Sequence, residues 1–434
     1  MQVSVEKTSE LSRKMTVSIP EEVVQEKMEV RFKSLAREVK LDGFRPGKVP
    51  LNVIKKKFAD RVRGEVSGDL IQSTYFEALQ QQDLIPAGHP HIHPADNSEG
   101  FEYVAEFEVY PEISLDVVDQ LEITRTSSTV EEADLDQMID KLREQKKDWN
   151  AVERASQEND RVTIHFSGVC DGENFTDGKV ENYQVVIGGK QMISGFEEEL
   201  VGLEAGASKT FDITFPEQYG NDKLAGKQAQ FEIEVIKVEE PVLPEVNADF
   251  IKAYGIEDGE MSSFRDDVKT NMERELEQAL KGKLKNAVMD AIYQNITVTT
   301  PKALVDQEIQ QLMQPYAENA KKQNLKLEDL DLPRDAFEEQ AKRRVALGLI
   351  LGEIIQKNEI KVDNEKVRET IENMANSYEK PEDVINWYYA DDSRLDDVRQ
   401  IVLEDQAVEW VVNKAKLSDE TVKFDEVMSG QHQH

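Results

Sequence analysis

The chain has one cysteine among its 434 residues and no long hydrophobic run. The lone Cys170 cannot close an internal disulfide, and a cysteine-based zinc cluster would need further thiols. A membrane-spanning helix requires about 18 or more consecutive apolar residues, and no such stretch occurs. The start of the chain alternates polar and apolar side chains and lacks the apolar core of a signal peptide. We therefore expect a cytoplasmic protein with no membrane partner and no redox chemistry.

Basic residues are scarce, because 53 Lys and Arg stand against 87 Asp and Glu, for a formal net charge of −34. This balance opposes non-specific binding to nucleic acid, so we expect no DNA partner. Residues 1–63 are the exception, with 15 basic and 9 acidic residues, a local charge of +6 that leaves −40 for the remainder. Any contact with a polyanion is therefore expected near the N-terminus.

The N-terminal part has the pattern of an α+β unit. Val3 to Ser18 reads as extended segments, and Ser18-Ile19-Pro20-Glu21 offers an N-cap, an early proline and a capping-box glutamate for a helix. Further helices are expected over Leu51 to Phe58 and Val62 to Leu79, and a strand over Phe101 to Val109. The first helix should bury one apolar stripe, formed by Val24, Met28, Phe32, Leu35 and Val39.

A loop rich in glycine and proline, Gly43-Phe44-Arg45-Pro46-Gly47-Lys48-Val49-Pro50, separates these helices and should protrude as a stiffened turn. It matches the GFRxGxxP signature at every fixed position and so resembles the bacterial trigger factors. In that family the loop seats beside the polypeptide exit tunnel of the large ribosomal subunit, which implies contacts with ribosomal protein and rRNA. Phe44 would fill an apolar pocket while Arg45 and Lys48 pair with carboxylates or phosphates. An ordinary connecting turn is the alternative. The ribosome-binding residues implied are Gly43, Phe44, Arg45, Pro46, Gly47, Lys48 and Pro50.

Three histidines, His89, His91 and His93, alternate in GHPHIHP, so an extended backbone would place them on one side. No carboxylate cluster follows nearby to complete a metal site, and the prolines favour a surface loop. We expect no metal here.

After Pro111 the pattern changes twice. Val130 to Trp149 reads as a charged helix with Leu135, Met138, Ile139 and Leu142 on one side. From Asp160 to Glu239 short β-rich runs are separated by glycine-containing turns, which predicts a compact, mostly antiparallel β-domain with one short helix. The runs are Val162 to Phe166, Gln184 to Ile187, Phe211 to Phe215 and Gln230 to Val238.

This β-domain resembles the FKBP family of prolyl isomerases. The likeness runs through Phe166-Ser167-Gly168, Asp171-Gly172 with Phe175, the stretch Ile187 to Glu197, Phe215-Pro216 with Tyr219-Gly220, and Phe231. The chain departs from the family at Thr176, where an aspartate is usual, and at Phe196, where a tryptophan is usual, so binding of FKBP-type macrolide drugs is not expected. The resemblance implies a catalytic proline pocket lined by Phe166, Phe175, Tyr183, Met192, Ile193, Phe196, Tyr219 and Phe231.

Prolyl isomerisation needs no nucleophile, metal or cofactor, because rotation about the X–Pro bond breaks no covalent bond. An apolar pocket that excludes water and fits the twisted amide favours the transition state. The resemblance further implies that the backbone N–H of Ile193 holds a substrate carbonyl and that the Tyr219 hydroxyl donates a hydrogen bond. His165 alternates with Phe166, so its ring should face away and take no part.

From Pro244 onward the pattern is helical. Apolar residues recur at every fourth position from Phe264 to Ile292, a spacing whose stripe winds around the helix and must meet different neighbours along its length. More helices are expected from Pro301 to Lys322 with a kink or break at Pro315, from Pro333 to Lys357, and from Arg394 to Leu417. The apolar run Val345 to Ile355 is either core or a client surface, with Gly348 and Gly352 permitting close helix approach. No nucleotide-binding motif appears.

These patterns predict an α+β multidomain protein: an α+β docking domain at 1–112, a linker at 113–149 that packs with the C-terminal domain, an FKBP-like antiparallel β-domain at 150–243, and an elongated all-α domain at 244–434. Trigger factors have a helical cradle that presents apolar patches, which implies an ATP-independent chaperone for nascent and unfolded polypeptides. A dedicated prolyl isomerase and an acidic helical adaptor remain the alternatives. Formation of a homodimer by the free molecule is left open.

Overall fold

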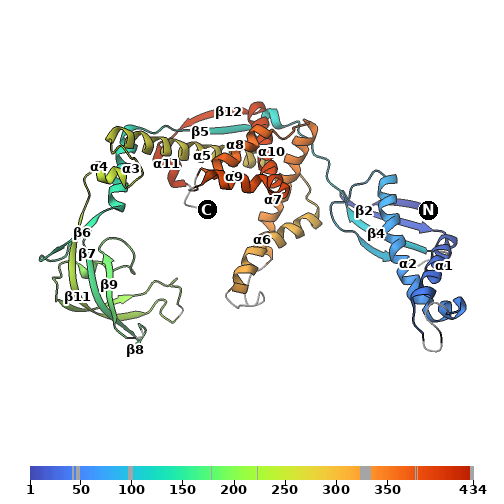
Figure 1. The fold of residues 1–434 in the computed structure, drawn as a ribbon, viewed down its shortest axis with the longest axis horizontal. Helices are drawn as coiled ribbons and strands as arrows, with labels where there is room; N and C mark the ends of the chain where they lie inside the picture. Colours follow the sequence, from blue (N-terminus) through green and yellow to red (C-terminus); the bar gives the residue numbers. More distant parts are fainter. Residues whose placement is uncertain are drawn as a thin grey trace. The chain divides into compact units, whose positions relative to one another are not determined.

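The computed structural model describes residues 1–41, 44, 49–95, 101–176, 178–221, 223–322, 334–376, 378 and 380–430. The chain divides into two compact units, one formed by residues 1–126 and 282–420 and the other by residues 127–281 and 421–434. Figure 1 colours the helices and strands along the sequence. Within the described ranges, no helix combines the length and the apolar character needed to cross a membrane.

The N-terminal part of the first unit is an antiparallel sheet beside two helices (Figure 1). The strands, in the order β1-β2-β4-β3, are β1 (Gln2–Lys7), β2 (Ser12–Ile19), β4 (Phe101–Glu108) and β3 (His91–Pro94). The helices are α1 (Glu21–Glu38) and α2 (Leu51–Gln81). Met15, Val17 and Tyr103 of the sheet share one core with Val24, Met28, Phe32 and Leu35 of α1. The predicted α+β pattern is confirmed, and so is the apolar stripe of the first helix except for Val39, which follows the helix as its C-cap and is partly buried.

Two local predictions in this part are wrong. The capping box at Ser18 does not form: Ser18 pairs within the sheet, Pro20 is the N-cap, and no side chain caps α1. The backbone of Ser18 is already committed to the strand ladder, so the helix begins only after the proline. The two helices expected between Leu51 and Leu79 are one continuous helix, because the intervening residues continue the helical pattern and bury Val62.

The helical part of the first unit contains α6 (Lys302–Lys322), α7 (Asp335–Lys357), α8 (Asn364–Ala375), α9 (Pro381–Tyr389) and α10 (Asp392–Lys414). Pro315 lies inside α6 and does not end it. The short helix η1 (Val118–Gln120) precedes β5 (Glu122–Ser127), which pairs with β12 (Lys416–Thr421) in a two-stranded sheet. Leu417 is therefore in a strand, and the helix expected to reach it ends three residues earlier. Sequence reasoning also missed β5, α8 and α9.

The second unit carries the β-domain. Its six-stranded sheet has the central order β10-β11-β7-β8, with β6 paired to β11 and β9 paired to β7, all antiparallel. The only regular helix between β9 and β10, a stretch that the structure describes throughout, is the single 3-10 turn η2 (Glu198–Leu200). The strands are β6 (Asp148–Val152), β7 (Arg161–Cys170), β8 (Glu173–Asn174), β9 (Val180–Val186), β10 (Ser208–Thr214) and β11 (Gln228–Val242).

Trp149 was expected in a helix and lies in a strand. The helix α3 (Glu132–Gln145) ends four residues before it, and Trp149 in β6 pairs with Pro241 of β11. The Arg161 guanidinium lies 4.7 Å from the centre of the indole ring and Lys147 Nζ 5.0 Å from it. A cation–π contact of this kind favours the strand position of Trp149. No feature of the local sequence predicts this contact.

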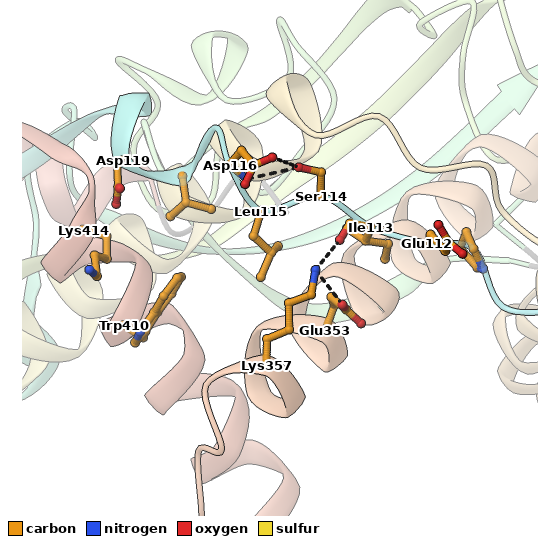
Figure 2. A pocket seen from close by; sticks show the side chains of 12 residues that line it. Glu112, Ile113, Ser114, Leu115, Asp116, Asp119, Glu353, Lys357, Trp410 and Lys414 are labelled. Carbon is orange, nitrogen blue, oxygen red and sulfur yellow. Dashed lines mark hydrogen bonds and ion pairs between the residues drawn. The ribbon is translucent and has the colours of Figure 1, made fainter.

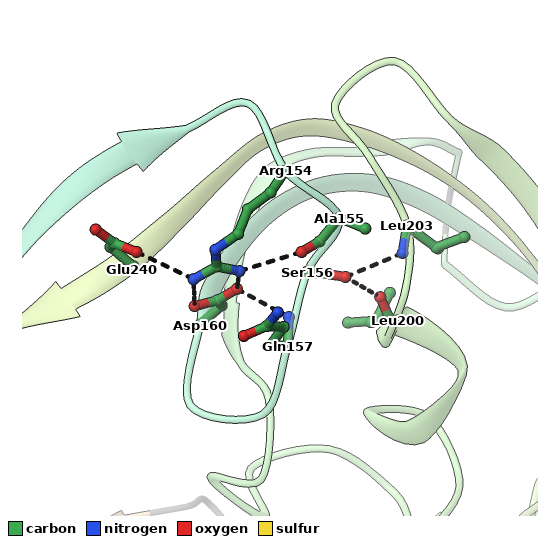
Figure 3. A network of polar contacts seen from close by, with 8 residues as sticks. All are labelled: Arg154, Ala155, Ser156, Gln157, Asp160, Leu200, Leu203 and Glu240. Atoms are coloured by element: carbon green, nitrogen blue, oxygen red, sulfur yellow. Dashed lines mark hydrogen bonds and ion pairs between the residues drawn. The ribbon is translucent and has the colours of Figure 1, made fainter.

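A polar network joins the turn between β6 and β7 to β11 and to the segment at the end of η2 (Figure 3). Arg154, in the turn after β6, donates to both oxygens of the buried Asp160 and to Glu240 of β11. Ser156 donates to the carbonyl of Leu200 and accepts from the N–H of Leu203. These bonds satisfy polar groups that burial would otherwise penalise, and they fix the turn from which β7 begins.

Helix α5 (Met261–Asn295) contributes to two separate cores, as its winding apolar stripe predicts. Phe264, Val268, Met272 and Leu276 pack with residues of α3, α4 (Ala248–Lys252) and α11 (Phe424–Ser429). Further along, Val288 and Ile292 pack with residues of α7 and α10 and with the segment after Ile113.

The apolar run in α7 is core. Ala346, Ile350, Leu351 and Ile354 are buried. The expectation that Gly348 and Gly352 permit close helix approach is wrong, since a Cβ added at either would meet nothing within 4 Å.

Candidate functional site

Six of the eight residues expected to line a proline site are aromatic. The structure joins five of these rings directly and the sixth, Tyr219, through Phe215, and we call this set the aromatic cluster. The centre of the Phe196 ring lies 5.2 Å from that of Phe231 and 6.0 Å from that of Phe166. Phe175 lies 5.6 Å from Phe231, and Tyr183 lies 5.6 Å from Phe166. Most pairs meet edge to face, the geometry that aromatic quadrupoles favour. The sequence-based grouping therefore describes residues that meet in space.

Tyr219 joins the cluster through a ring that sequence reasoning did not assign to the site. Phe215, directly after β10, lies 4.7 Å from Tyr219 and 5.6 Å from Phe175. Phe211 likewise lies 5.4 Å from Phe196. The alternation of Phe211, Ile213 and Phe215 was the available signal, because it places all three on one face of an extended segment.

Different elements position the eight residues. Phe166 comes from β7, Tyr183 from β9 and Phe231 from β11, while Phe175 follows β8. The other four lie in the segments between β9 and η2 and after β10. Gly168 is required by this arrangement, since a Cβ there would lie 2.3 Å from the Phe175 ring.

The cluster has a buried side and an exposed side. Phe196 and Phe231 are 0% and 3% exposed, whereas Tyr183 and Tyr219 are 40% and 38% exposed. Phe166, Phe175, Met192 and Ile193 are partly buried and pack against the same core. An apolar base with two hydroxyl-bearing rings at its edge suits a ligand that is apolar on one side and hydrogen-bonding on the other.

Ile193 brings a backbone donor to this site. Its N–H donates to no other atom of the described residues, while its carbonyl accepts from the N–H of Phe196 at 3.1 Å. The neighbouring Glu197 is buried, and its carboxylate accepts hydrogen bonds from the N–H groups of Gly188, Lys190, Gln191 and Met192. A free N–H beside an apolar surface is available to a peptide carbonyl.

Two further residues have local partners. His165 Nδ1 accepts a hydrogen bond from the backbone N–H of Asn182 at 2.9 Å, so this ring nitrogen is already occupied. Thr176 Oγ1 accepts from the N–H of Gly168 and donates to the carbonyl of Gly178. The threonine thus fastens the loop after β8, next to Phe175.

The loop expected to dock lies largely outside the described residues, which do not include Gly43, Arg45, Pro46, Gly47 or Lys48. Phe44 is described and is 40% exposed, and its N–H donates to the carbonyl of Leu41 at 3.1 Å. Pro50 is the exposed N-cap of α2. Leu41 and Val49 both pack against the N-terminal core. The two ends of the loop are therefore anchored in the core, and the Phe44 ring between them is exposed to solvent.

The histidines show no metal-binding geometry. His91 and His93 are exposed as expected, but they lie in strand β3, which pairs with β4, and not in a loop. His93 Nε2 lies 3.9 Å from a carboxylate oxygen of Glu106. In the part of the chain that the structure describes, no group of three or more His, Cys, Asp or Glu side chains is placed to hold a metal ion.

The helical part of the first unit contains a cavity that sequence reasoning did not find. Figure 2 shows it between the segment 111–119 and the helices α7 and α10, with a volume of about 920 Å³. Leu115 and Trp410 give it apolar surface. Lys357 donates to the carbonyl of Ile113 at 2.8 Å and pairs with Glu353 at 2.9 Å. The cavity therefore combines apolar side chains with fixed charges.

A second cavity, of about 700 Å³, lies at α8 and α9 and is lined by Met374, Tyr378, Asp383, Val384, Trp387 and Tyr388. Its rings are unusually open to water, with Tyr378 60% and Trp387 52% exposed. The Arg394 guanidinium lies 3.9 Å from the centre of the Trp387 ring and donates to the Trp387 carbonyl. This contact holds the indole in place while leaving it accessible.

Three family models match the chain. The model described as bacterial trigger factor protein matches residues 1–142, and the model for the C-terminus of that protein matches residues 260–413. The model described as FKBP-type peptidyl-prolyl cis-trans isomerase matches residues 152–236, which contain the whole aromatic cluster.

Full-length relatives agree with these models. The trigger factor of Pseudomonas putida is 45% identical over 434 residues, covering 99% of this chain and 98% of the relative. That of Pseudomonas aeruginosa is 43% identical with the same coverage. A solved structure described as "Promiscuous Substrate Recognition in Folding and Assembly Activities of the Trigger Factor Chaperone" has a TM-score of 0.51 at 16% identity, covers 95% of this chain and 99% of its own, and supports the fold. The chain belongs to the bacterial trigger factor family and is a chaperone with peptidyl-prolyl cis-trans isomerase activity.

Proposed function

We propose that this trigger factor docks on the large ribosomal subunit near the exit tunnel, shelters nascent and unfolded polypeptides without ATP, and isomerises their X–Pro bonds at the aromatic cluster. The proposal places the protein in the cytoplasm. It assigns docking to residues 1–112, isomerisation to 150–243, and client binding to 244–434 together with the linker 113–149. The observation that carries the docking step is the exposed Phe44 between two loop ends that are fixed in a core.

The isomerase step follows from the geometry of the cluster. Rotation about an X–Pro amide has a barrier of about 20 kcal/mol, and the planar amide is stabilised by resonance that water solvates well. The partly buried side chains of Phe166, Phe175, Met192 and Ile193 offer the proline ring an apolar surface, and the buried rings of Phe196 and Phe231 support it from below. A carbonyl of the substrate accepts from the free N–H of Ile193, and the Tyr219 hydroxyl donates a second hydrogen bond. These contacts favour the twisted amide over the planar one.

Client binding is assigned to the two cavities of the helical part. Each offers apolar rings beside charged groups, Trp410 in one and Trp387 with Tyr378 in the other. Several weak apolar contacts along one chain hold an unfolded segment reversibly, because each contact raises the effective concentration for the next. The strongly acidic composition keeps the loaded chaperone dispersed.

The docking proposal is tested by changing Phe44, Arg45 and Lys48 together to alanine and pelleting ribosomes at two salt concentrations. We expect the triple variant to stay in the supernatant while its isomerase activity is unchanged. A matched control removes one exposed phenyl ring and two cations elsewhere in the same domain, by Phe76→Ala, Lys7→Ala and Lys27→Ala, and should still sediment. Wild-type sedimentation should weaken with salt, because a charge-assisted contact is screened. Co-sedimentation of the triple variant at the wild-type level would refute the assignment.

The two alternatives predict different results. A dedicated isomerase would lose its suppression of aggregation together with its isomerase site. An acidic adaptor would not bind unfolded peptides that lack proline, whereas a holdase binds them. Whether the free molecule forms a homodimer is a separate question, answered by its sedimentation velocity over a range of concentrations.

A further inference from the structure

We propose that Glu197 is a positioning residue for the isomerase reaction. Its buried carboxylate holds the loop from Gly188 to Met192 and thereby keeps the N–H of Ile193 available to the substrate carbonyl. The inference rests on the proposed proline site and adds a residue that does not touch the proline ring. Nothing in the resemblance to prolyl isomerases assigned a role to this side chain.

The contacts of Glu197 are all with backbone donors. Its Oε2 accepts from the N–H groups of Gly188 at 2.9 Å and Lys190 at 3.0 Å. Its Oε1 accepts from those of Gln191 at 2.8 Å and Met192 at 3.1 Å. The residue is only 7% exposed. Converging backbone N–H groups form a concave anion site, and a carboxylate that fills it makes charge-assisted hydrogen bonds.

The loop needs this support because its backbone is strained. Gly188 has φ +86° and Lys190 has φ +53°, so a lysine adopts the left-handed region that L-residues with a Cβ disfavour. Gly189 donates to the carbonyl of Val186 at 3.0 Å, which closes the turn. Without the carboxylate, four backbone N–H groups would lose their acceptor, and the loop would relax.

The pattern of donors explains the role of Ile193. Gly188, Lys190, Gln191 and Met192 give their N–H groups to Glu197, and Ile193 is the next residue along the chain. Its N–H donates to no other atom in the described part of the chain. Phe196, directly before Glu197, is fully buried among the rings of the aromatic cluster. The adjacent residues Phe196 and Glu197 thus connect the apolar base of the site to the loop that carries the N–H of Ile193.

The test is Glu197→Gln in the full chain. Glutamine keeps the volume, but its amide nitrogen is a donor and would face two backbone N–H groups that need an acceptor. We expect kcat/KM on a proline peptide to fall about tenfold. The loss should fall on kcat more than on KM, because the rings that hold the proline are unchanged. Hydrogen exchange should accelerate in residues 187–193 and nowhere else in the domain.

Two further variants make the test specific. Glu198→Gln removes the exposed carboxylate next in sequence and should leave activity and exchange unchanged. Glu197→Asp keeps the charge but is too short to reach all four donors, so its activity should lie between those of the wild type and Glu197→Gln.

Activity of Glu197→Gln within twofold of the wild type would overturn the inference. So would accelerated exchange throughout β7 and β11 in both Glu197 variants, since the loss would then come from unfolding. Failure of the underlying site has a different signature: Phe196→Ala would then retain full isomerase activity. A chain that loses activity with Phe196→Ala but keeps it with Glu197→Gln has the proposed site without the proposed positioning residue.

Discussion

The isomerase domain and the helical part of the chain use their apolar residues in opposite ways. The β-domain gathers its phenylalanines into one core, and its candidate site is the exposed edge of that core. The helical part of the first unit distributes buried residues over three separate clusters and leaves Tyr378, Trp387 and Tyr389 open to water. A single preorganised site suits a reaction with one transition state. Several partial surfaces suit clients that share no sequence.

The difference also appears in the charges. In the β-domain the carboxylates of Glu197, Asp160 and Glu239 are buried and each has fixed donors. In the helical part most ion pairs are exposed, as in the pair of Arg368 with Glu372. Exposed pairs contribute little to stability and rearrange easily. Among the described residues, buried carboxylates with fixed donors thus belong to the β-domain, and one of them, Glu197, lies beside the candidate site.

Phe196→Ala should give the largest effect. It tests directly whether the isomerase domain and the helical part act independently. Removal of a fully buried ring costs about 3–5 kcal/mol of local stability, and it takes away the base of the proline site. We expect kcat/KM for isomerisation to fall by about 100-fold or more. Suppression of aggregation of a denatured client should be unchanged, measured by light scattering. Loss of both activities would mean that the two regions are not independent and would favour the dedicated isomerase.

Glu239→Gln tests how much a buried, paired carboxylate contributes to stability in comparison with a more exposed one. Burial opposes ionisation of this carboxyl, but hydrogen bonds from Lys237 and Arg161 outweigh it and lower the pKa of Glu239. We expect the variant to lose about 2 kcal/mol of unfolding free energy at pH 7. Glu240→Gln, at a partly exposed carboxylate of the same strand, should lose less than about 1 kcal/mol.

The Glu239 effect should depend on pH with a defined sign. A lowered pKa contributes stability above the ordinary value of about 4.3, and this contribution is lost as the pH falls through the lowered pKa. The urea concentration at the midpoint of unfolding should therefore differ less between the wild type and Glu239→Gln below about pH 4. Hydrogen exchange of β7 reports the unfolding of this domain. A difference in midpoint that stays constant to about pH 3 would contradict the ion-pair explanation.

Trp387→Ala combined with Tyr378→Ala is the counterpart of the Phe196 change. Both rings are more exposed than buried, so the fold should tolerate their loss. We expect client affinity to weaken by on the order of 1 kcal/mol, a factor of about five, because other apolar surfaces remain. Isomerase activity on a short peptide should be unchanged. The control Tyr110→Ala removes an exposed ring outside the cavity and should leave client affinity intact.

Gly348→Ala and Gly352→Ala should have the smallest effect, and its sign is informative. Each glycine lies in α7, and the place that an added methyl group would take has no neighbouring atom within 4 Å. Alanine should therefore stabilise the helix by about 0.5–1 kcal/mol per site. A higher melting temperature of the double variant would support this. Destabilisation would restore the idea that these glycines serve close packing.

Much of the fold follows from local patterns. The strands β4, β7, β10 and β11 and the helices α1 and α5 were predicted from alternation or helical spacing, because their apolar positions repeat at the period of the element. Strand β5, by contrast, pairs with β12, whose residues lie far along the chain. The sequence close to β5 therefore does not reveal its partner strand. The exact end of α3 and the place of Trp149 likewise depend on β11 and Arg161.

The residues of the candidate sites also fall into those named from the sequence and those found only in the structure. Eight residues were named for the proline site from a sequence resemblance, and the structure brings five of their rings into direct contact. The resemblance also ran through Phe215 and Glu197, but only the structure showed that Phe215 links Tyr219 to the other rings and that Glu197 holds the neighbouring loop. The cavity at Trp410 had no signal in the sequence, since three separate segments line it and come together only on folding. The cavity at Trp387 is lined by residues 374–388 alone and was missed together with α8 and α9.

The sequence by itself determined the family, because its short motifs are local properties, and through the family resemblance it supplied the isomerase chemistry and the residues proposed for the proline site. Tertiary structure decided which buried polar groups share partners, which rings stay open to water and which N–H finds no acceptor among the described residues. These depend on competition among distant segments for the same space and the same hydrogen bonds. A carboxylate such as that of Glu197 has no assigned role until four backbone donors converge on it.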